Sequence, residues 1–281
     1  MIGAVDSWRS DLVGIVERAR LADGDDAVRI ALEDLLGGLP VDSQRIAPLS
    51  PPVAVLGVDG CKGGWVGVLV QPGGQTTLHV ASTIVGLVEQ IRGTSELGVV
   101  AIDIPIGLPD HSVREADRLV RAELPGKASS VFATAPRAAY SAPDYEAARA
   151  ASVAASDTGA SLSAQAWALA PKILQVDEWV RTHPSTFVIE VHPELSFARI
   201  NGEPVLAKKK TSEGGSTRRR LLESVGVTVP HMYSGMGFEE DDLLDACAAA
   251  WSAARFAAGA SESFPPEPEV FSDGIGAAIR V

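Results

Sequence analysis

The stretch VAVLGVDGCKGGWVGVLV, residues 53–70, is the most informative part of the sequence for the fold. Two apolar runs, 53–58 and 65–70, flank a turn that contains three glycines among its six residues. Glycine adopts positive φ angles without steric cost, so this pattern is typical of a tight hairpin. A third, alternating run at 76–81 follows a Pro-Gly-Gly turn. The sequence therefore predicts an antiparallel three-stranded meander over residues 53–81.

The remainder of the domain alternates between strand and helix patterns. Residues 97–104 are continuously apolar except for Asp103, as expected for a buried central strand, and 187–191 predicts a fifth strand. Helical spacing of apolar residues predicts helices over 83–91, 112–124, 144–156, 161–181, 217–225 and 241–258. This order predicts an α/β fold in which a mixed five-stranded sheet carries helices on both faces.

The first 50 residues differ from the rest of the chain. Apolar residues recur at helical spacing in two short segments within residues 1–36, separated by a Gly-Asp-Asp turn. A glycine- and proline-containing linker then leads to Pro51 and Pro52. We predict a helical extension and linker over 1–50 and one main domain over 53–281. The extension could pack on that domain, or residues 1–36 could form a homodimer or partner contact.

Composition narrows the class of protein. Of the 281 residues, 46% are hydrophobic and 21% charged, which excludes global disorder. The only two cysteines, Cys61 and Cys247, exclude a disulfide scaffold. No apolar run approaches the roughly 18 residues of a membrane span, and no basic region followed by an apolar segment marks a secretory signal. We therefore expect a cytoplasmic protein without a membrane partner.

The charge of the chain is unevenly distributed. The net charge is −12, from 24 Lys+Arg against 36 Asp+Glu, which argues against a broad basic groove for nucleic acid. Yet residues 208–220, KKKTSEGGSTRRR, hold six bases and one acid. This segment is either a solvated loop that leads into a helix or a loop that contacts phosphate, with Lys208 or Lys210 as the contact.

Two further basic residues could bind an anionic substrate. Lys62 lies in the glycine-rich turn and could hold a phosphate, or it could be solvated. Arg137 could grip an anion through its planar guanidinium, or it could pair with an acid such as Glu190 or Glu194.

Several acids occupy positions that are otherwise apolar. Asp59, Asp103 and Glu190 each lie in or at the end of an apolar strand, where a lone carboxylate costs several kcal/mol unless it is paired. Asp242 and Asp245 lie three residues apart on one face of the last helix, beside a run of alanines suited to close packing on a sheet. Taken singly, these acids could cap turns, form ion pairs or favour the helix dipole.

Taken together, the acids predict a metal site. Carboxylates that converge at one end of a sheet repel one another unless a cation lies between them, and oxygen ligands suit Mg²⁺ or Mn²⁺. Two such ions can clamp the attacking and leaving oxygens of a phosphoryl transfer. The expected metal ligands are Asp59, Asp103, Asp242 and Asp245. Glu190 and His192 would assist catalysis; a structural hydrogen bond is the alternative for His192.

Six motifs, in this order along the chain, resemble one known family. They are GVDGCKGGWV (57–66), AIDIPIGLP (101–109), SVFATAPR (130–137), KILQVDEWV (172–180), EVHPELSF (190–197) and DDLLDA (241–246). The combination resembles the bacterial predicted RNase H-like nucleases, a family catalogued as a domain of unknown function. The resemblance covers roughly residues 53–258.

This resemblance implies an RNase H-like fold with the carboxylate layout of RuvC-type resolvases. It implies one acid on the first strand, Asp59, one on the fourth, Asp103, and the pair Asp242 and Asp245 on the final helix. Glu190 is an additional feature of the family.

The expected function is therefore a metal-dependent phosphodiester hydrolase that acts on nucleic acid or on a small phosphate ester. Two alternatives stay open. One is a non-enzymatic binding or scaffold module with a structural ion or none. The other is an ATP-dependent phosphotransferase of the actin-like and sugar kinase class. The segment Gly57–Trp65 faintly resembles the phosphate-binding hairpin of those enzymes. Those enzymes carry two copies of the core, and the chain after Pro51 has room for one.

Overall fold

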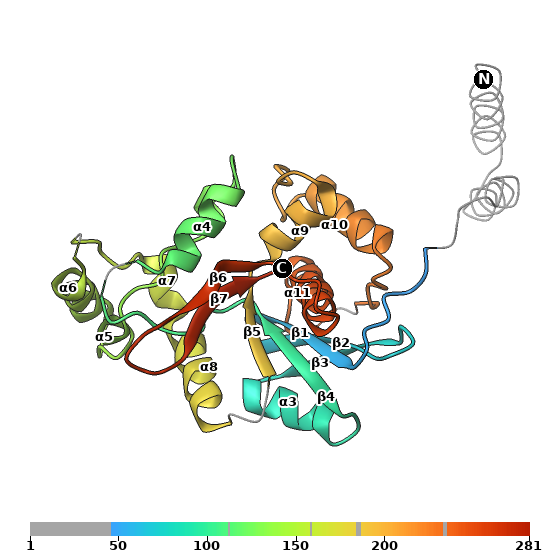
Figure 1. Ribbon diagram of the computed structural model, residues 1–281, viewed down its shortest axis with the longest axis horizontal. Helices are drawn as coiled ribbons and strands as arrows, with labels where there is room; N and C mark the ends of the chain where they lie inside the picture. The colour runs from blue at the N-terminus through green and yellow to red at the C-terminus, as the bar shows by residue number, and fades with distance from the viewer. Residues whose placement is uncertain (1–45, 112, 158, 184–186, 233–234) are drawn as a thin grey trace, which may run out of the picture. The chain divides into compact units, whose positions relative to one another are not determined.

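A seven-stranded mixed sheet forms the centre of the structure (Figure 1). The computed structural model describes residues 46–281 apart from 112, 158, 184–186 and 233–234. Within it, Ile46–Val281 form one compact unit, and the helices and partner contact predicted within residues 1–36 lie outside the described residues. The strand order is β3-β2-β1-β4-β5-β7-β6. The strands are β1 Ala54–Cys61, β2 Gly64–Val70, β3 Thr76–Ala81, β4 Leu97–Ile102, β5 Phe187–Val191, β6 Ser263–Val270 and β7 Gly276–Arg280.

All five strands predicted from the sequence are confirmed. β1, β2 and β3 form the antiparallel meander, and β4 and β5 continue the sheet parallel to β1. Because β1, β4 and β5 run in the same direction, their carboxyl ends meet at one edge of the sheet. That edge holds the site described below.

The predicted strand count was wrong, because two strands follow the last long helix. β7 pairs parallel to β5, and β6 pairs antiparallel to β7 at the edge of the sheet. Prolines in SFPPEPEV argue against a strand, since proline cannot donate to a ladder. The ladder resolves the conflict, because its register shifts between Phe264 and Glu269 and leaves all three prolines unpaired. An edge strand tolerates this interruption.

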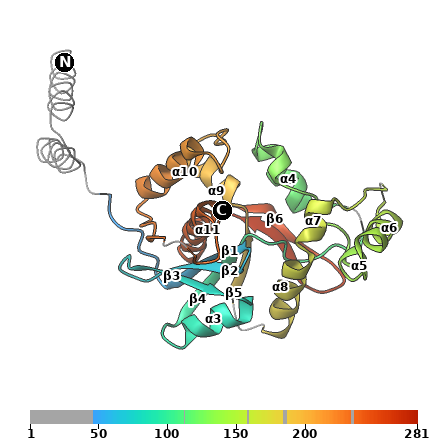
Figure 2. The same cartoon turned by 180° about the vertical axis from the view of Figure 1, so that it is seen from behind.

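Helices cover both faces of the sheet, as predicted (Figures 1 and 2). α9, α10 and α11 lie on one face, and α3 and α8 lie on the other. The helices are α3 Ile84–Arg92, α4 Glu115–Glu123, α5 Arg137–Tyr140, α6 Tyr145–Ala155, α7 Ala164–Ala168, α8 Ala170–Thr182, α9 Pro193–Asn201, α10 Ser212–Ser224 and α11 Glu240–Ala257, with a 3₁₀ turn at Ala128–Ser130. Among these described helices, none has the length and apolar character needed to cross a membrane.

Close packing of α11 on β1 sets the geometry of the site. A Cβ atom added to Gly57 would lie 2.0 Å from the backbone nitrogen of Ala250 and 2.2 Å from the carbonyl oxygen of Ala246. Glycine in the strand and alanine in the helix therefore let the two backbones approach as the alanine run predicted. This contact brings the first turns of α11 against the carboxyl end of β1.

Two helix predictions need correction. The single helix expected over 161–181 is divided at Leu169 into α7 and α8, because Pro171 lies in the first turn of α8 and cannot continue a preceding helix. The helix expected from 217 begins at Ser212, where the Thr211 side chain accepts a hydrogen bond from the Gly214 N–H at 3.1 Å. Residues 212–220 of the basic segment are thus helical, so the predicted loop is shorter than expected.

Candidate functional site

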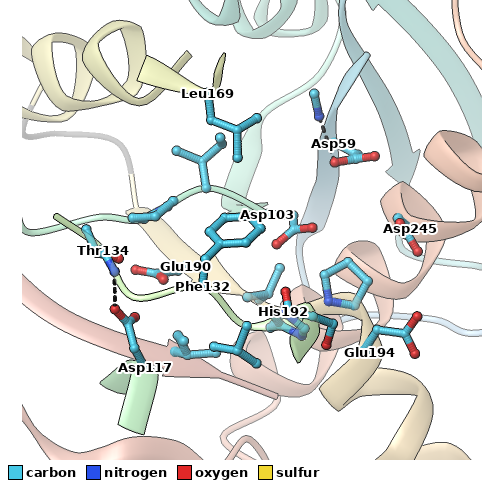
Figure 3. A pocket seen from close by; sticks show the side chains of 18 of the residues that line it. Asp59, Asp103, Asp117, Phe132, Thr134, Leu169, Glu190, His192, Glu194 and Asp245 are labelled. Atoms are coloured by element: carbon cyan, nitrogen blue, oxygen red, sulfur yellow. Dashed lines mark hydrogen bonds between the residues drawn. The ribbon is translucent and has the colours of Figure 1, made fainter. Parts of the chain in front are cut away.

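A cavity of about 320 Å³ lies beyond the carboxyl ends of β1, β4 and β5 (Figure 3). Crevices at this edge of parallel strands are common ligand sites in α/β proteins. The cavity is lined by all the residues that were predicted to be catalytic or metal-binding: Asp59, Asp103, Asp242, Asp245, Glu190 and His192.

The strand register and the α11 contact bring three carboxylates together. Val58 pairs with Ile102 in the parallel ladder, and the Asp103 N–H donates to the Val58 carbonyl at 3.1 Å, so Asp103 lies beside Asp59. Asp59 alternates with Val58 and therefore shares the α11 face of β1 with Gly57. Asp245 lies on α11 immediately before Ala246, whose carbonyl approaches Gly57. Three separate elements thus supply this carboxylate cluster: Asp59, Asp103 and Asp245.

The carboxylate cluster is electrostatically strained. Burial raises the pKa of Asp103 to about 7, with Glu190 and Glu194 adding to the shift. Burial also raises the pKa of Asp245 to about 7, and the Asp103 carboxylate contributes. The pKa of Asp59 is raised well above its usual value by burial and then by the other two acids of the cluster. These shifts mean that the site favours any bound positive charge.

Lys209 supplies the positive charge within the protein. Its Nζ donates a hydrogen bond to Asp245 Oδ2 at 2.7 Å and lies 3.5 Å from Asp241 Oδ2. Burial works to lower the pKa of Lys209, but the Asp245, Asp59 and Asp241 carboxylates raise it above its usual value. The ammonium is therefore charged and partly offsets the repulsion among the acids.

The donor chemistry of the cluster suits a divalent cation, although the side chains do not form a closed ligand shell. Within residues 46–281, leaving out the gaps named above, no three His, Cys, Asp or Glu side chains are arranged as a metal site. However, the Asp245 Oδ1 atom is buried without a hydrogen-bond partner among the described residues. An unpaired carboxylate oxygen beside two other carboxylates has the chemistry of a hard-cation ligand. The residues therefore fit such an ion if side chains rotate toward it.

Asp242 has a structural task as well as a place in the cavity. Its Oδ2 accepts a hydrogen bond from the Glu239 N–H at 2.8 Å, and Glu239 in turn caps the third residue of α11. This reciprocal capping box is the helix-terminus role that was the alternative for Asp242. Burial raises its pKa, and the Glu239 N–H opposes the shift. Only one of its oxygens is occupied by the cap.

Glu190 is held by a buried arginine. Ile189 and Val191 pack in the core on the α11 side, so Glu190 between them points to the opposite face. There Arg114 donates to its Oε2 at 2.8 Å and to its Oε1 at 2.7 Å, and the Ile106 N–H donates to Oε2 at 2.7 Å. The ion pair that the sequence left open for Glu190 is present, which leaves this carboxylate little capacity to act in catalysis.

Arg114 also binds a second buried acid. It donates to Asp117 Oδ1 through Nη2 at 2.6 Å and through Nε at 3.1 Å. The other oxygen of Asp117 accepts the Thr134 N–H at 2.6 Å. Arg114 is 1% exposed, so this triad of Arg114, Asp117 and Glu190 forms one buried charged wall of the cavity.

His192 lines the same cavity and is neutral. Its Nε2 is 3.3 Å from the Ser130 carbonyl oxygen. Since a carbonyl only accepts, Nε2 carries the proton and Nδ1 is the acceptor. Burial lowers the pKa of His192, and Nδ1 is buried without a hydrogen-bond partner in the described part of the chain. His192 thus presents an unused basic nitrogen.

The four residues predicted to bind substrate, Lys62, Arg137, Lys208 and Lys210, do not line the cavity. Arg137 donates to Asp177 at 2.7 and 2.8 Å and also pairs with Asp273, so its partners are neither Glu190 nor Glu194. Lys62 and Lys208 are exposed and do not line the cavity. Lys210 is also exposed, with its Nζ 3.9 Å from Asp241 Oδ2.

Sequence reasoning missed several residues of the cavity. In the lysine run it named Lys208 and Lys210, whereas the intervening Lys209 reaches the acids. It also missed the Arg114–Asp117 pair and the side chains of Phe132 and Thr134. A signal for the arginine existed, because a buried Glu190 requires a cation nearby. No periodicity distinguishes the three lysines.

We expect the stability of the cation-free protein to decrease as the pH rises from about 4 to about 7 through this site. Asp103 and Asp245 have a pKa of about 7 in the fold against 3.8 ordinarily, so in this window the folded state binds protons more tightly than the unfolded chain. Melting temperatures in EDTA across this range measure the effect. Burial lowers the pKa of His192 and of His79, so these two histidines raise the stability as the pH rises. The comparison is therefore with Asp103→Asn, which should make the decrease in stability shallower. An unchanged slope would contradict the assignment.

Comparisons with known proteins give a family and no activity. A family model described as "Protein of unknown function (DUF429)" matches residues 57–270. No curated protein and no solved structure matches the chain significantly.

Proposed function

Since the chain belongs to this family of proteins of unknown function, we propose its activity from the site: a metal-dependent phosphodiester hydrolase with an RNase H-like fold. The observation that carries the proposal is the convergence of Asp59, Asp103 and Asp245 from β1, the end of β4 and α11 in one cavity. Ionised carboxylates gathered in this way repel one another unless positive charge lies nearby, and they offer oxygen ligands to Mg²⁺ or Mn²⁺.

The topology supports the RNase H-like part of the proposal. The first five strands have the order β3-β2-β1-β4-β5, with β1, β2 and β3 antiparallel and β4 and β5 parallel to β1. The acids fall on the first strand, directly after the fourth and on the last helix, which is the layout that the resemblance implies. β6 and β7 are additions beyond the five strands.

The chain offers a role for each residue around the cluster. Asp59, Asp103 and Asp245 would hold the ion, and Asp242 could add the oxygen that its capping bond leaves over. A bound divalent ion supplies positive charge to phosphate oxygens and acidifies a water molecule at neutral pH. Lys209, released from Asp245, would face the phosphate, and His192 Nδ1 would accept a proton.

The size and charge of the cavity indicate a locally gripped substrate. A volume of about 320 Å³ is at the lower end of the range for small-molecule pockets. The cavity is lined by seven acids, by Lys209 and by an Arg114 that is already paired. A duplex needs a broad basic surface, so we propose a small phosphate ester or one nucleotide of a strand as the substrate.

The test compares Asp103→Asn with Glu96→Gln on a chromogenic phosphodiester and on single-stranded DNA and RNA, with and without Mn²⁺. Glu96 is an exposed acid immediately before β4, at the opposite end of the strand from Asp103. We expect Mn²⁺-dependent hydrolysis that Glu96→Gln keeps and Asp103→Asn loses by about 100-fold or more, since even indirect metal contacts are worth 10–100-fold. Equal activity in both variants would indicate a contaminant.

Melting curves with Mn²⁺ add a readout that does not depend on turnover. A ligand of the folded state raises its stability, so the wild type should gain more from Mn²⁺ than Asp103→Asn. No gain in the wild type and no hydrolysis would favour a non-enzymatic binding module, in which Lys209 alone neutralises the acids.

A further inference from the structure

We propose that the substrate of this site is a nucleotide unit whose base stacks on Phe132 and bonds to Thr134, with its phosphate at the carboxylate cluster. The phosphate end rests on the proposed function. The base end rests on separate observations at the opposite side of the cavity.

The residues that line the two ends of this cavity include three with a buried, unpaired polar atom. In the described part of the chain, Thr134 Oγ1, His192 Nδ1 and Asp245 Oδ1 are buried without a hydrogen-bond partner, and all three residues line the cavity. Thr134 is 2% exposed, so water does not readily satisfy its hydroxyl from the outside. Buried polar groups are normally paired, and several orphans around one cavity indicate a polar ligand.

An aromatic side chain lies between these ends. Phe132 lines the cavity and is only half-buried, unlike the core side chains around it. In Figure 3 its ring lies between Asp103 and the Thr134–Asp117 pair, while Asp59 and Asp245 lie on the far side of Asp103. A half-buried phenyl face at a cavity wall is a stacking surface for a planar ring. Nucleobases of every kind stack on such aromatic side chains, because each base has a flat face.

The charged groups at the Phe132 end are not available to a ligand. Arg114, Asp117 and Glu190 satisfy one another through hydrogen bonds of 2.6–3.1 Å. The Thr134 N–H is also used, since it donates to Asp117. By contrast, the neutral hydroxyl of Thr134 is buried without a partner among the described residues, and it can both donate and accept. This end therefore suits an uncharged ring with polar edges, and the other end suits phosphate.

Calorimetry with AMP, GMP, CMP and UMP, against ribose 5-phosphate, tests the proposal in excess MnCl₂ and again in EDTA. All five carry the same phosphate group and the nucleotides add a base. We expect at least one nucleotide to bind wild type about ten-fold tighter than ribose 5-phosphate, as stacking on one aromatic side chain supplies. Equal affinities for all five probes, or no binding of any nucleotide, would overturn the proposal.

Two variants locate the base. Phe132→Leu keeps an apolar side chain without an aromatic face and should abolish the difference between nucleotide and ribose 5-phosphate, whereas Phe132→Tyr should keep it. Thr134→Val should weaken nucleotide binding, leave ribose 5-phosphate binding unchanged and not lower the melting temperature, because its hydroxyl has no partner to lose among the described residues. A difference retained in both Phe132→Leu and Thr134→Val would contradict the placement.

The outcomes separate this inference from the proposed function. Base-dependent binding in EDTA, without Mn²⁺-dependent hydrolysis, would support the base site and sink the hydrolase. Hydrolysis with equal binding of nucleotides and ribose 5-phosphate would support the hydrolase and sink the base site.

Discussion

Arg114→Met is expected to destabilise the protein by about 3–5 kcal/mol, which lowers the melting temperature by roughly 10 °C for a unit of this size. Arg114 is 1% exposed and binds both Asp117 and Glu190. Methionine fills a similar length but leaves two buried carboxylates without their cation, and the low polarity around them makes this costly. Thermal or urea unfolding in EDTA measures the loss.

Arg118→Met is the matched control on the same helix. Arg118 pairs with Glu115, and its side chain is 63% exposed. Exposed ion pairs contribute little, so this variant should melt within about 1–2 °C of the wild type. Equal losses for the two variants would show that the buried triad does not stabilise this part of the fold. Glu190→Gln, which keeps the shape of the Arg114 partner, should retain most of the proposed hydrolysis of the chromogenic phosphodiester.

Lys209→Met is expected to lower the stability of the cation-free protein and to increase the stabilisation that Mn²⁺ provides. The Lys209 ammonium is 2.7 Å from Asp245 Oδ2, and without it the carboxylate cluster keeps its mutual repulsion with no counter-charge. Since the Lys209 side chain is 39% exposed, we expect a loss of about 1–2 kcal/mol, below that of a fully buried pair. Added Mn²⁺ should restore the melting temperature, because the ion no longer competes with the ammonium for Asp245.

Lys208→Met provides the control one residue away. Lys208 is exposed, and its backbone carbonyl, which the substitution keeps, accepts the hydrogen bonds that begin α10. This variant should match the wild type with and without Mn²⁺. If Mn²⁺ raised the melting temperature of Lys209→Met no more than that of Lys208→Met, the Lys209 ammonium would not occupy the position proposed for the metal ion.

Local patterns in the sequence account for the elements that carry the site. The apolar runs and glycines of 53–70 predict the hairpin whose first strand, β1, carries Asp59, and the apolar run before Asp103 predicts β4. The alanines after Asp245 predict close packing of α11 on the sheet, and the structure places that contact at Gly57. The proline-rich β6 escaped prediction because its strand pairing depends on a register shift opposite β7, which neighbouring residues do not encode.

The sequence alone identified the acids of the site, because burying an unpaired carboxylate in an apolar strand costs free energy and therefore indicates a function. The cations that compensate those acids were decided by the tertiary structure. Lys209 and Asp245 are 36 residues apart, and Arg114 and Glu190 are 76 apart. Charges pair through space, so their partners emerge only once the sheet and α11 are assembled. The packing thus commits Glu190 to the fold and leaves Asp59, Asp103 and Asp245 facing the cavity.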